Sequence, residues 1–386
     1  MATSKDNVKR LLAHAGITVN GDHPWDIQVH NENFYQRVLT HGTIGLGESY
    51  MENWWDCARI DQFITKVLTS KVDLEKEIRG NRSMMFHIIL SKLFNRQQGS
   101  QAYKNAQRHY DIGNDLFSRM LDKRMVYTCG YWKNVTTLDE AQEQKLHLTC
   151  KKLYLEPGME VLDIGCGWGS FAKFAAENYG VHVTGITVSK EQVELGNELC
   201  KGLPVEIKLM DYREVNRKFD RVVSLGMFEH VGHKNHRTYM EVAKRCMKHD
   251  ALFLLHTIGN NVSRKHPDPW MNKYIFPNYN VPSVKQIATA AEGLFVMEDW
   301  HNFGTDYDKT LMAWYHNFTS HWDELKGHYD ERFFRMWSFY LLLCAACFRA
   351  KHNMLWQIVF SNKERVMPYT SVRLPAKKAP VVQLVS

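Results

Sequence analysis

Between residues 160 and 256, short apolar segments alternate with stretches long enough to form helices. Strands that alternate with helices predict a parallel, doubly wound sheet and therefore an α/β fold. In such a sheet, ligands bind at the carboxyl ends of the strands, near the point where the strand order switches. The predicted strands span residues 160–164, 181–187, 205–210, 221–225 and 252–256, with later ones at 295–300 and, after an antiparallel return, 355–360.

The first predicted strand runs into a glycine-rich turn, Asp163-Ile-Gly-Cys-Gly-Trp-Gly169, and a helix follows it. Glycines let the backbone approach a ligand closely, and the start of the helix offers N–H groups. A dinucleotide fingerprint would need G-x-G-x-x-G and a carboxylate at the end of the second strand. Here the spacing is G-x-G-x-G, and the second strand ends in Ile186-Thr-Val-Ser189. The turn favours S-adenosylmethionine over NAD, and a turn without a ligand stays a third alternative.

The length of 386 residues predicts two or three domains. Composition divides the chain into a small N-terminal domain (1–95), a polar linker (96–108), a larger α/β domain (109–362) and a flexible basic tail (363–386). A helix expected over 84–94 has a broad apolar face. We expect that face to lie on a membrane, on the α/β domain or across a dimer.

The first twenty residues contain four charged side chains and no long apolar run, so no signal peptide is expected. The longest uncharged apolar stretch, 337–348, is shorter than the ~20 residues that cross a bilayer. These features predict a cytoplasmic protein. The net charge of +7 suits a weakly basic surface, but no nucleic-acid-binding signature is found, so no nucleic acid is expected as a partner. Cys344 and Cys347 lack a second Cys/His pair at zinc-site spacing, so no metal site is predicted.

Several motifs together resemble the cyclopropane-fatty-acyl-phospholipid synthases of the mycolic acid cyclopropane synthase family. They lie at residues 45–55, 127–132, 161–169, 185–192, 227–232, 255–259, 268–277 and 307–314. The resemblance implies a Rossmann-like class I methyltransferase fold with an α-helical cap and a mostly helical N-terminal domain that handles lipid. It also implies transfer of a methylene group from S-adenosylmethionine to the cis double bond of an acyl chain in a membrane phospholipid. A homodimer on the inner face of the cytoplasmic membrane, bound peripherally, is expected as well.

The resemblance also assigns the cofactor site. Gly165 and Gly167 are expected to approach the methionine moiety, and Thr187 and Gln192 to replace the usual ribose carboxylate by neutral hydrogen bonds. For Asp211, a solvent-facing loop position remains an alternative. The expected cofactor-binding positions are Tyr127, Thr128, Gly165, Gly167, Thr187, Gln192, Asp211, Tyr212 and Gly226.

For the base that completes the reaction, the resemblance implies a bound bicarbonate ion. Glu229 would meet this anion as a like charge, unless it is protonated, shares a proton with the ion or orients His256 as a cation. We favour the shared proton. Helix capping by Glu229 and a core role for His256 are the structural alternatives, and His230 is expected to point away from Glu229. The implied bicarbonate positions are Cys129, Glu229, His256, Ile258 and Tyr307.

Cys344 aligns with a cysteine proposed as a nucleophile in the family, but methyl transfer to an alkene needs no covalent enzyme intermediate. Its apolar surroundings predict an inert thiol that borders the acyl channel. Aromatic residues after the fifth strand and in the last helices are expected to form this channel or to fill the core. Two rival functions stay open: a methyltransferase that acts on a small polar acceptor or on an alkene without closing a ring, and a non-enzymatic membrane- or nucleic-acid-binding protein.

Overall fold

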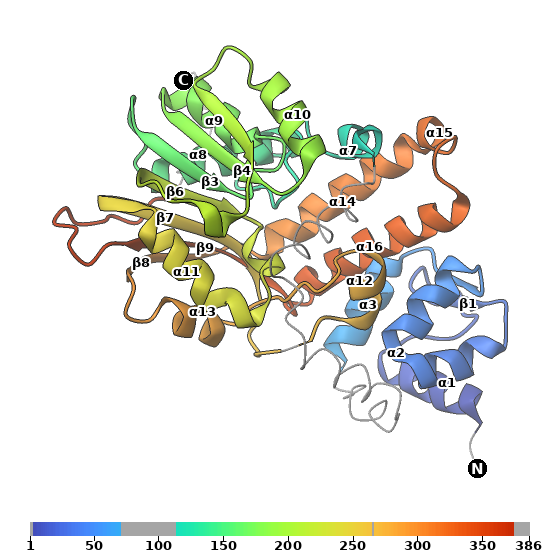
Figure 1. The fold of residues 1–386 in the computed structure, drawn as a ribbon. Helices are drawn as coiled ribbons and strands as arrows, with labels where there is room; N and C mark the ends of the chain where they lie inside the picture. The colour runs from blue at the N-terminus through green and yellow to red at the C-terminus, as the bar shows by residue number, and fades with distance from the viewer. Residues whose placement is uncertain (1–2, 71–112, 265, 374–386) are drawn as a thin grey trace, which may run out of the picture.

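The computed structural model describes residues 3–70, 113–264 and 266–373. Within them, a seven-stranded sheet has the order β5-β4-β3-β6-β7-β9-β8 (Figure 1). The predicted domain boundaries at 95/96 and 108/109, the helix expected over 84–94, and residues 374–386 lie outside the described residues.

Six strands of this sheet run parallel to one another, and β9, between β7 and β8, is antiparallel to both of its neighbours. Because β4 and β5 extend the sheet on one side of β3 while β6 and β7 extend it on the other, the strand order switches at β3. The predicted doubly wound α/β fold is therefore confirmed, and only the fifth strand is much longer than expected. The strands are β3 (Glu160–Ile164), β4 (His182–Thr187), β5 (Val205–Leu209), β6 (Phe219–Leu225), β7 (Met247–Gly259), β8 (Val296–Asn302) and β9 (Met354–Ser361).

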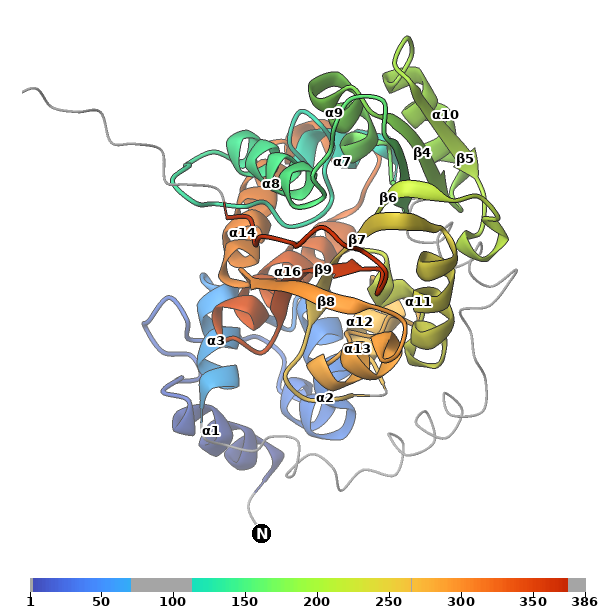
Figure 2. The same cartoon turned by 90° about the vertical axis from the view of Figure 1, so that its left-hand side faces the viewer.

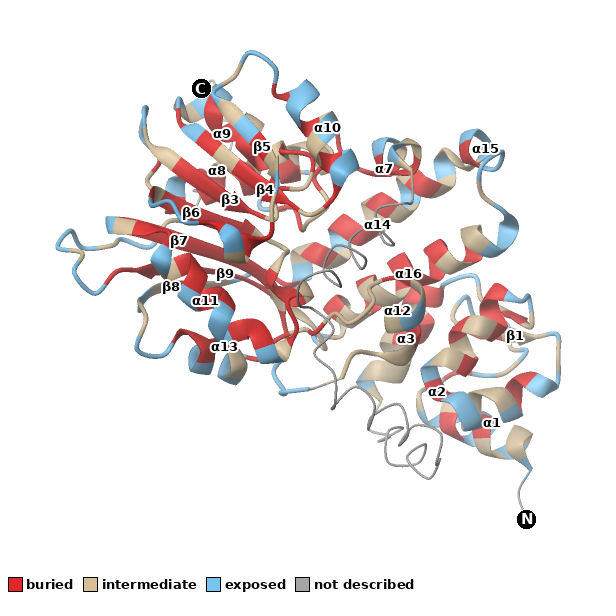
Figure 3. Ribbon diagram, in the orientation of Figure 1, coloured by how far each residue is buried: buried red, intermediate tan, exposed pale blue. Residues whose placement is uncertain are grey.

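Helices cover both faces of the sheet, because successive strand residues point to opposite sides. Val161 packs with α8 (Leu138–Lys152) and α9 (Ser170–Tyr179), whereas Leu162 packs with α11 (His236–Arg245) and α13 (Val284–Ala291). Figure 3 shows the resulting buried layer along the strands. After β4, α10 (Lys190–Leu199) begins at the predicted cap, where the Ser189 hydroxyl accepts a hydrogen bond from the backbone N–H of Gln192.

A helical cap stands over the carboxyl ends of the strands and joins the N-terminal region. The cap consists of α7 (Asn114–Met120), α12 (Pro269–Tyr274), α14 (Thr305–Ser320), α15 (Trp322–Leu325) and α16 (Glu331–Arg349). The N-terminal region contains α1 (Ser4–His14), β1 (Gln28–Val29), α2 (Asn33–Met51), β2 (Trp55–Asp56) and α3 (Ile60–Thr69). In Figure 1 these N-terminal elements (blue) lie across α16 from the sheet. The mostly helical character of this region agrees with the sequence prediction.

The N-terminal region and the cap share one hydrophobic core. Trp55 of β2 contacts Phe339 of α16, and their ring centroids are 6.4 Å apart. The buried Arg335 guanidinium on α16 donates to the backbone carbonyls of Tyr50 and Trp55 and, at 2.7 Å, to the Asp56 carboxylate. The described part of the N-terminal region is therefore packed as a continuation of the cap.

The segment that follows β9 is bound to the sheet edge as far as Arg373. Its guanidinium forms two hydrogen bonds, of 2.7 and 2.8 Å, with the buried Asp299 carboxylate of β8. The Tyr369 ring stacks on Tyr154, just beyond α8. Figure 2 shows this segment (dark red) beside β8 and β9. Residues 363–373 belong to the segment predicted as a flexible tail, and Arg373 of that segment pairs with a carboxylate buried on the edge strand.

Among the helices that the structure describes, none combines the length and the apolar composition needed to span a membrane.

Candidate active site

A cavity lies at the carboxyl ends of β3, β4, β5 and β6, where the doubly wound topology predicts a ligand site. The walls come from the glycine turn after β3, the loops after the other three strands, and the segment that precedes α8. Phe276 and Pro277, which follow α12, close it from the cap side. All nine sequence-predicted cofactor positions line this cavity: Tyr127, Thr128, Gly165, Gly167, Thr187, Gln192, Asp211, Tyr212 and Gly226.

The glycine turn places backbone, rather than side chains, against the cavity. Gly165 and Gly167 both have positive φ angles, of 80° and 56°, which other residues adopt only with strain. A Cβ atom on Gly165 would lie 2.8 Å from the Cβ atom of Met227, whereas one on Gly167 would meet no atom within 4 Å. Gly167 thus faces open space, where a ligand can approach its backbone.

The polar groups after β4 and β5 are held by hydrogen bonds of their own. The Thr187 hydroxyl donates to the side-chain carbonyl oxygen of Gln192 at 2.6 Å and accepts from the backbone N–H of Ser189. The Asp211 carboxylate is buried and receives two hydrogen bonds from the Arg213 guanidinium. Asp211 is therefore not a solvent-facing loop acid, and Arg213 balances its charge at the cavity.

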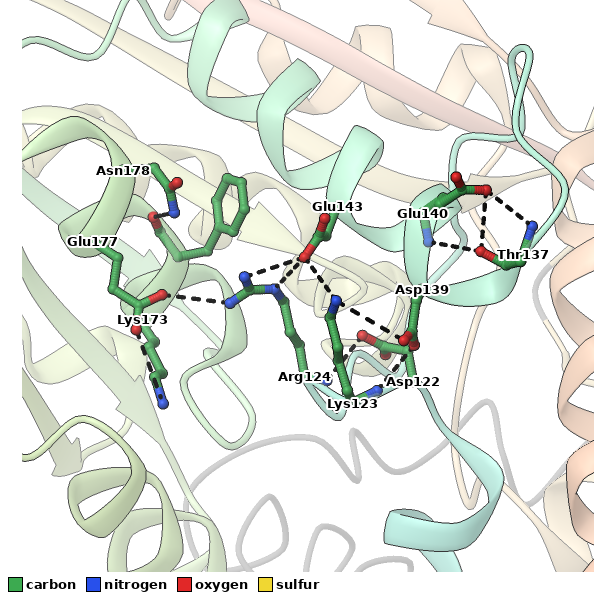
Figure 4. A network of polar contacts seen from close by, with 11 residues as sticks. Asp122, Lys123, Arg124, Thr137, Asp139, Glu140, Glu143, Lys173, Glu177 and Asn178 are labelled. Atoms are coloured by element: carbon green, nitrogen blue, oxygen red, sulfur yellow. Dashed lines mark hydrogen bonds and ion pairs between the residues drawn. The ribbon is translucent and has the colours of Figure 1, made fainter.

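An ion-pair network fixes the loop that carries Tyr127 and Thr128 (Figure 4). Asp122 accepts hydrogen bonds from the backbone N–H groups of Val126 and Arg124, at 2.8 and 3.0 Å. The Arg124 side chain bridges Glu143 of α8 and Glu177 of α9. The Gln142 amide of α8 donates to the Thr128 carbonyl at 2.7 Å. These contacts hold the loop across two helices, so that its backbone is set before a ligand arrives.

Two buried charged residues in the cavity wall receive no role from the sequence argument. Lys145 of α8 donates from its ammonium group to the Thr128 hydroxyl at 2.8 Å, and burial lowers its pKa to about 8. Asp163, at the end of β3, has a pKa raised to about 7 by burial. Its Oδ1 atom has no hydrogen-bond partner among the described residues. The sequence signal that could have found Lys145 is a lysine on the apolar face of a helix.

Glu229 lies beside β7 rather than capping a helix. Its Oε1 atom accepts a hydrogen bond from the backbone N–H of Ile258 at 2.5 Å. Its Oε2 atom is buried and has no partner among the described residues. Burial raises the pKa of Glu229 to about 7, so the protonated form is accessible near neutral pH. One predicted bicarbonate position, Glu229, thus has an oxygen that the described residues leave without a partner, and a second, Ile258, orients the same carboxyl group.

His256 is a neutral imidazole in the interior of the sheet. Burial, together with the nearby Lys145 and Lys152 cations, holds its pKa well below the ordinary value. Its Nδ1 atom lies 3.4 Å from the side-chain nitrogen of Gln357, whose amide also donates to the Thr149 hydroxyl. If Nδ1 accepts from Gln357, the proton of the ring resides on Nε2, a buried atom without a partner among the described residues. A cationic His256 oriented by Glu229 is not supported by this arrangement.

Tyr307 of α14 and Cys129 complete the set of predicted bicarbonate positions. Burial raises the pKa of Tyr307 well above its ordinary value, with smaller contributions from Cys129, Tyr127 and Glu229. The tyrosine is therefore a neutral phenol in the electrostatic range of those groups. Cys129 is fully buried, its pKa is also raised well above the ordinary value by burial, and the Thr310 hydroxyl lies 3.9 Å from its sulfur.

Cys344, on α16, has a thiol with a raised pKa. Burial, followed by Cys347 and Asp268, raises the pKa of Cys344 well above the ordinary value, so the thiolate is not formed near neutral pH. The residue also contributes to the raised pKa of Tyr307, which puts it on the cap side of the site.

The sequence argument gives His230 no role, but the structure places it in the cavity wall next to the glycine-turn residues. Its ring centroid lies 5.4 Å from that of Phe276. Burial lowers its pKa to about 4, so it faces the cavity as a neutral imidazole. The short helical turn that points Glu229 toward β7 turns its neighbour into the cavity.

Known proteins resemble the chain over most of its length. Residues 97–358 match the family model "Mycolic acid cyclopropane synthetase". A cyclopropane-fatty-acyl-phospholipid synthase from Escherichia coli K12 is 53% identical over 352 residues, which cover 91% of this chain and 92% of that protein. A probable fatty acid methyltransferase from Pseudomonas putida is 34% identical over 68% of this chain and 71% of its own length.

A solved structure gives the same picture. The mycolic acid cyclopropane synthase CmaA1, complexed with SAH and CTAB, superposes with a TM-score of 0.64 at 30% sequence identity. The match covers 67% of this chain and 98% of that one. By its sequence and its fold, this chain belongs to the mycolic acid cyclopropane synthetase family and is an S-adenosylmethionine-dependent methyltransferase.

Proposed function

We propose that the chain transfers a methylene group from S-adenosylmethionine to the cis double bond of an unsaturated acyl chain in a membrane phospholipid, forming a cyclopropane ring. The observation that carries the proposal is that all nine predicted cofactor positions line one cavity, which Phe276 and Pro277 close from the cap side. The E. coli relative, named for this activity, supports it over 91% of the chain.

The residues of the cavity fit S-adenosylmethionine. The space in front of Gly167, which a Cβ atom would enter without contact, suits a ligand held against the backbone. The Oδ1 atom of Asp163, which no described residue contacts by a hydrogen bond, offers an acceptor at the same turn. When bound, S-adenosylmethionine supplies an electrophilic sulfonium methyl group. The glycine turn, Thr187, Gln192 and Asp211 would hold the rest of the molecule, so that its reactive end faces the cap.

The cap residues exclude water and face the acyl chain with aromatic rings. Tyr127 and Tyr340 pair through their hydroxyl groups at 2.9 Å, which ties the cavity loop to α16. The Trp314 ring lies 5.2 Å from that of Tyr127, and Tyr307 lies 5.9 Å from Trp314. An alkene is a weak nucleophile whose attack leaves positive charge on carbon. Aromatic faces in a dry site stabilise such charge without competing as nucleophiles.

Ring closure requires that a proton leave the added methyl group, while the electron pair of that C–H bond forms the last ring bond. We assign the proton acceptor to a bicarbonate ion held by Cys129, Glu229, His256, Ile258 and Tyr307. Two observations fit a small oxyanion: the Oε2 atom of Glu229 and the Nε2 atom of His256 are both buried, and neither has a partner within the described ranges of the chain. Glu229, with its raised pKa, would share a proton with the ion, and the His256 and Tyr307 groups would donate hydrogen bonds to it.

The remaining expectations belong to the same proposal. They are a lipid-handling N-terminal region, a homodimer, and a cytoplasmic location with peripheral contact to the inner face of the membrane. Cys344 would border the acyl channel. A substrate that stays in the bilayer requires contact with its surface, and the printed name of the E. coli relative supports a phospholipid substrate.

The test is incubation of the protein with vesicles of an unsaturated phospholipid and S-adenosylmethionine that carries a labelled methyl group. Cyclopropane proton signals in the extracted lipids, at a rate that rises with added bicarbonate, are expected. Branched-methyl signals would instead favour a methyltransferase that adds a methyl branch without closing a ring, and the P. putida relative is named as a probable fatty acid methyltransferase. Cyclopropane formation that bicarbonate depletion leaves unchanged would reject the assigned proton acceptor and keep the reaction.

A further inference from the structure

Lys145 is a buried cation for which the proposed chemistry has no use. Its side chain is fully buried, and the Thr128 hydroxyl is its one hydrogen-bond partner among the described residues. An ammonium group has three N–H donors, so two of them have no acceptor in the described protein. A buried charge without enough hydrogen-bond partners is strongly unfavourable, which indicates that a ligand supplies the missing acceptors.

The ammonium group is at the cavity, close to a buried acid of opposite charge. Lys145, Thr128 and Asp163 all line the cavity. The Lys145 cation lowers the pKa of Asp163, and Asp163 raises the pKa of Lys145. The two side chains nevertheless form no ion pair in the described structure. The cavity therefore contains a cationic lysine and a carboxyl group that ionises near neutral pH, and each has hydrogen-bonding capacity that the described residues leave unused.

Ligand groups that match this pair are a carboxylate for the lysine and an ammonium group for the aspartate. The amino-acid end of S-adenosylmethionine carries both of them on one carbon atom. We propose that Lys145 binds the carboxylate of the amino-acid end of S-adenosylmethionine, alongside the Thr128 hydroxyl that it orients. This inference rests on the use of S-adenosylmethionine by the chain, and it does not depend on the lipid product or on bicarbonate.

The charge state agrees with this role. Burial lowers the pKa of Lys145 to about 8, and the Asp122, Cys129 and Asp163 groups limit the decrease. The side chain is therefore mainly cationic at pH 7. A second lysine on the same helix, Lys152, provides a matched control. It is also fully buried, but its ammonium group pairs with Asp299 at 3.3 Å, and it is not among the residues that line the cavity.

The experiment is calorimetric titration of the full chain with two ligands, S-adenosylhomocysteine and its decarboxylated analogue, which keeps the amine. The wild type should bind S-adenosylhomocysteine about 10- to 100-fold more tightly, as expected for a charge-assisted hydrogen bond in a buried site. Lys145→Met should remove most of this preference by weakening S-adenosylhomocysteine alone. Lys152→Met should keep the preference of the wild type.

Lys145→Gln serves as a second variant, because it keeps a donor for Thr128 but has no charge. It should lose the preference as Lys145→Met does, even if the latter fails to fold. The proposal is overturned if the wild type binds both ligands equally, or if a folded Lys145 variant keeps the preference. The proposal is also overturned by a variant that weakens the binding of both ligands by the same factor. Lys145 would then only support the conformation of the loop that carries Thr128. Failure of ring formation on lipids would leave all these binding results unaffected.

Discussion

Replacing Glu229 by glutamine tests two properties of this carboxyl group: how much its buried charge destabilises the fold, and whether its proton takes part in the reaction. The pKa of Glu229 is raised from 4.5 to about 7 in the fold, chiefly by burial. Between these values the folded chain binds more protons than the unfolded chain, so stability falls as the pH rises through this window. The difference corresponds to about 3 kcal/mol of unfolding free energy, present as a cost above pH 7 and absent below pH 4.5.

Glutamine has the same shape and stays neutral. Its side-chain oxygen can still accept the hydrogen bond from the Ile258 N–H that Glu229 accepts at 2.5 Å. Glu229→Gln should therefore exceed the wild type in stability by less than about 1 kcal/mol at pH 5 and by about 3 kcal/mol at pH 8. Urea unfolding at both pH values measures this difference. The difference between the unfolding free energies of the two proteins contains no contribution from other buried acids, such as Asp163 and Asp122, because both proteins have them.

The same variant should be a poor enzyme. A group that takes part in proton transfer contributes about 10²- to 10⁴-fold to the rate, so turnover on lipid vesicles should fall within that range at every bicarbonate concentration. Two results would refute the reasoning: a stability difference that does not change between pH 5 and pH 8, or an unaltered turnover across a bicarbonate titration. The first would show that Glu229 is not a buried acid with a raised pKa, and the second that its proton is not used.

Three further changes test other parts of the structure. Gly167→Ala places a Cβ atom in the space proposed for the cofactor, so calorimetry should show at least 10-fold weaker binding of S-adenosylhomocysteine. Because residue 167 has a φ angle of 56°, urea unfolding should also show that the free energy of unfolding falls by about 1 kcal/mol. Arg335→Met removes three hydrogen bonds between α16 and the N-terminal region and should lower the unfolding free energy by about 3–5 kcal/mol, whereas a loss below 1 kcal/mol would contradict the shared core. Asp299→Asn leaves the Lys152 and Arg373 cations without their carboxylate, so amide hydrogen exchange should accelerate across residues 363–373. Unchanged protection there would show that the Arg373–Asp299 pair does not hold this segment on the sheet edge.

Much of the catalytic core follows from local sequence patterns. Alternating strands and helices determine a parallel sheet, and the chemistry of the glycine turn is readable because Gly165 and Gly167 need backbone angles that few residues adopt. Since all parallel strands end at one edge, residues such as Thr187 and Asp211 are brought together by topology alone. Seven of the nine cofactor positions share one cavity for this reason, whereas Tyr127 and Thr128 reach it from the segment before α8 and were expected there only from the family resemblance.

Other properties depended on contacts between distant segments, which no local pattern encodes. Burial of Lys145 against Thr128, the neutral state of His256 between two lysines, and the pairing of Arg373 with Asp299 all require knowing which elements meet. A charged side chain has the same letter in the sequence whether water or protein surrounds it, but its proton affinity and its partners are set by that environment. The sequence by itself therefore determined the scaffold and the place of the site, and only the tertiary structure decided which buried groups carry charge and face the cavity.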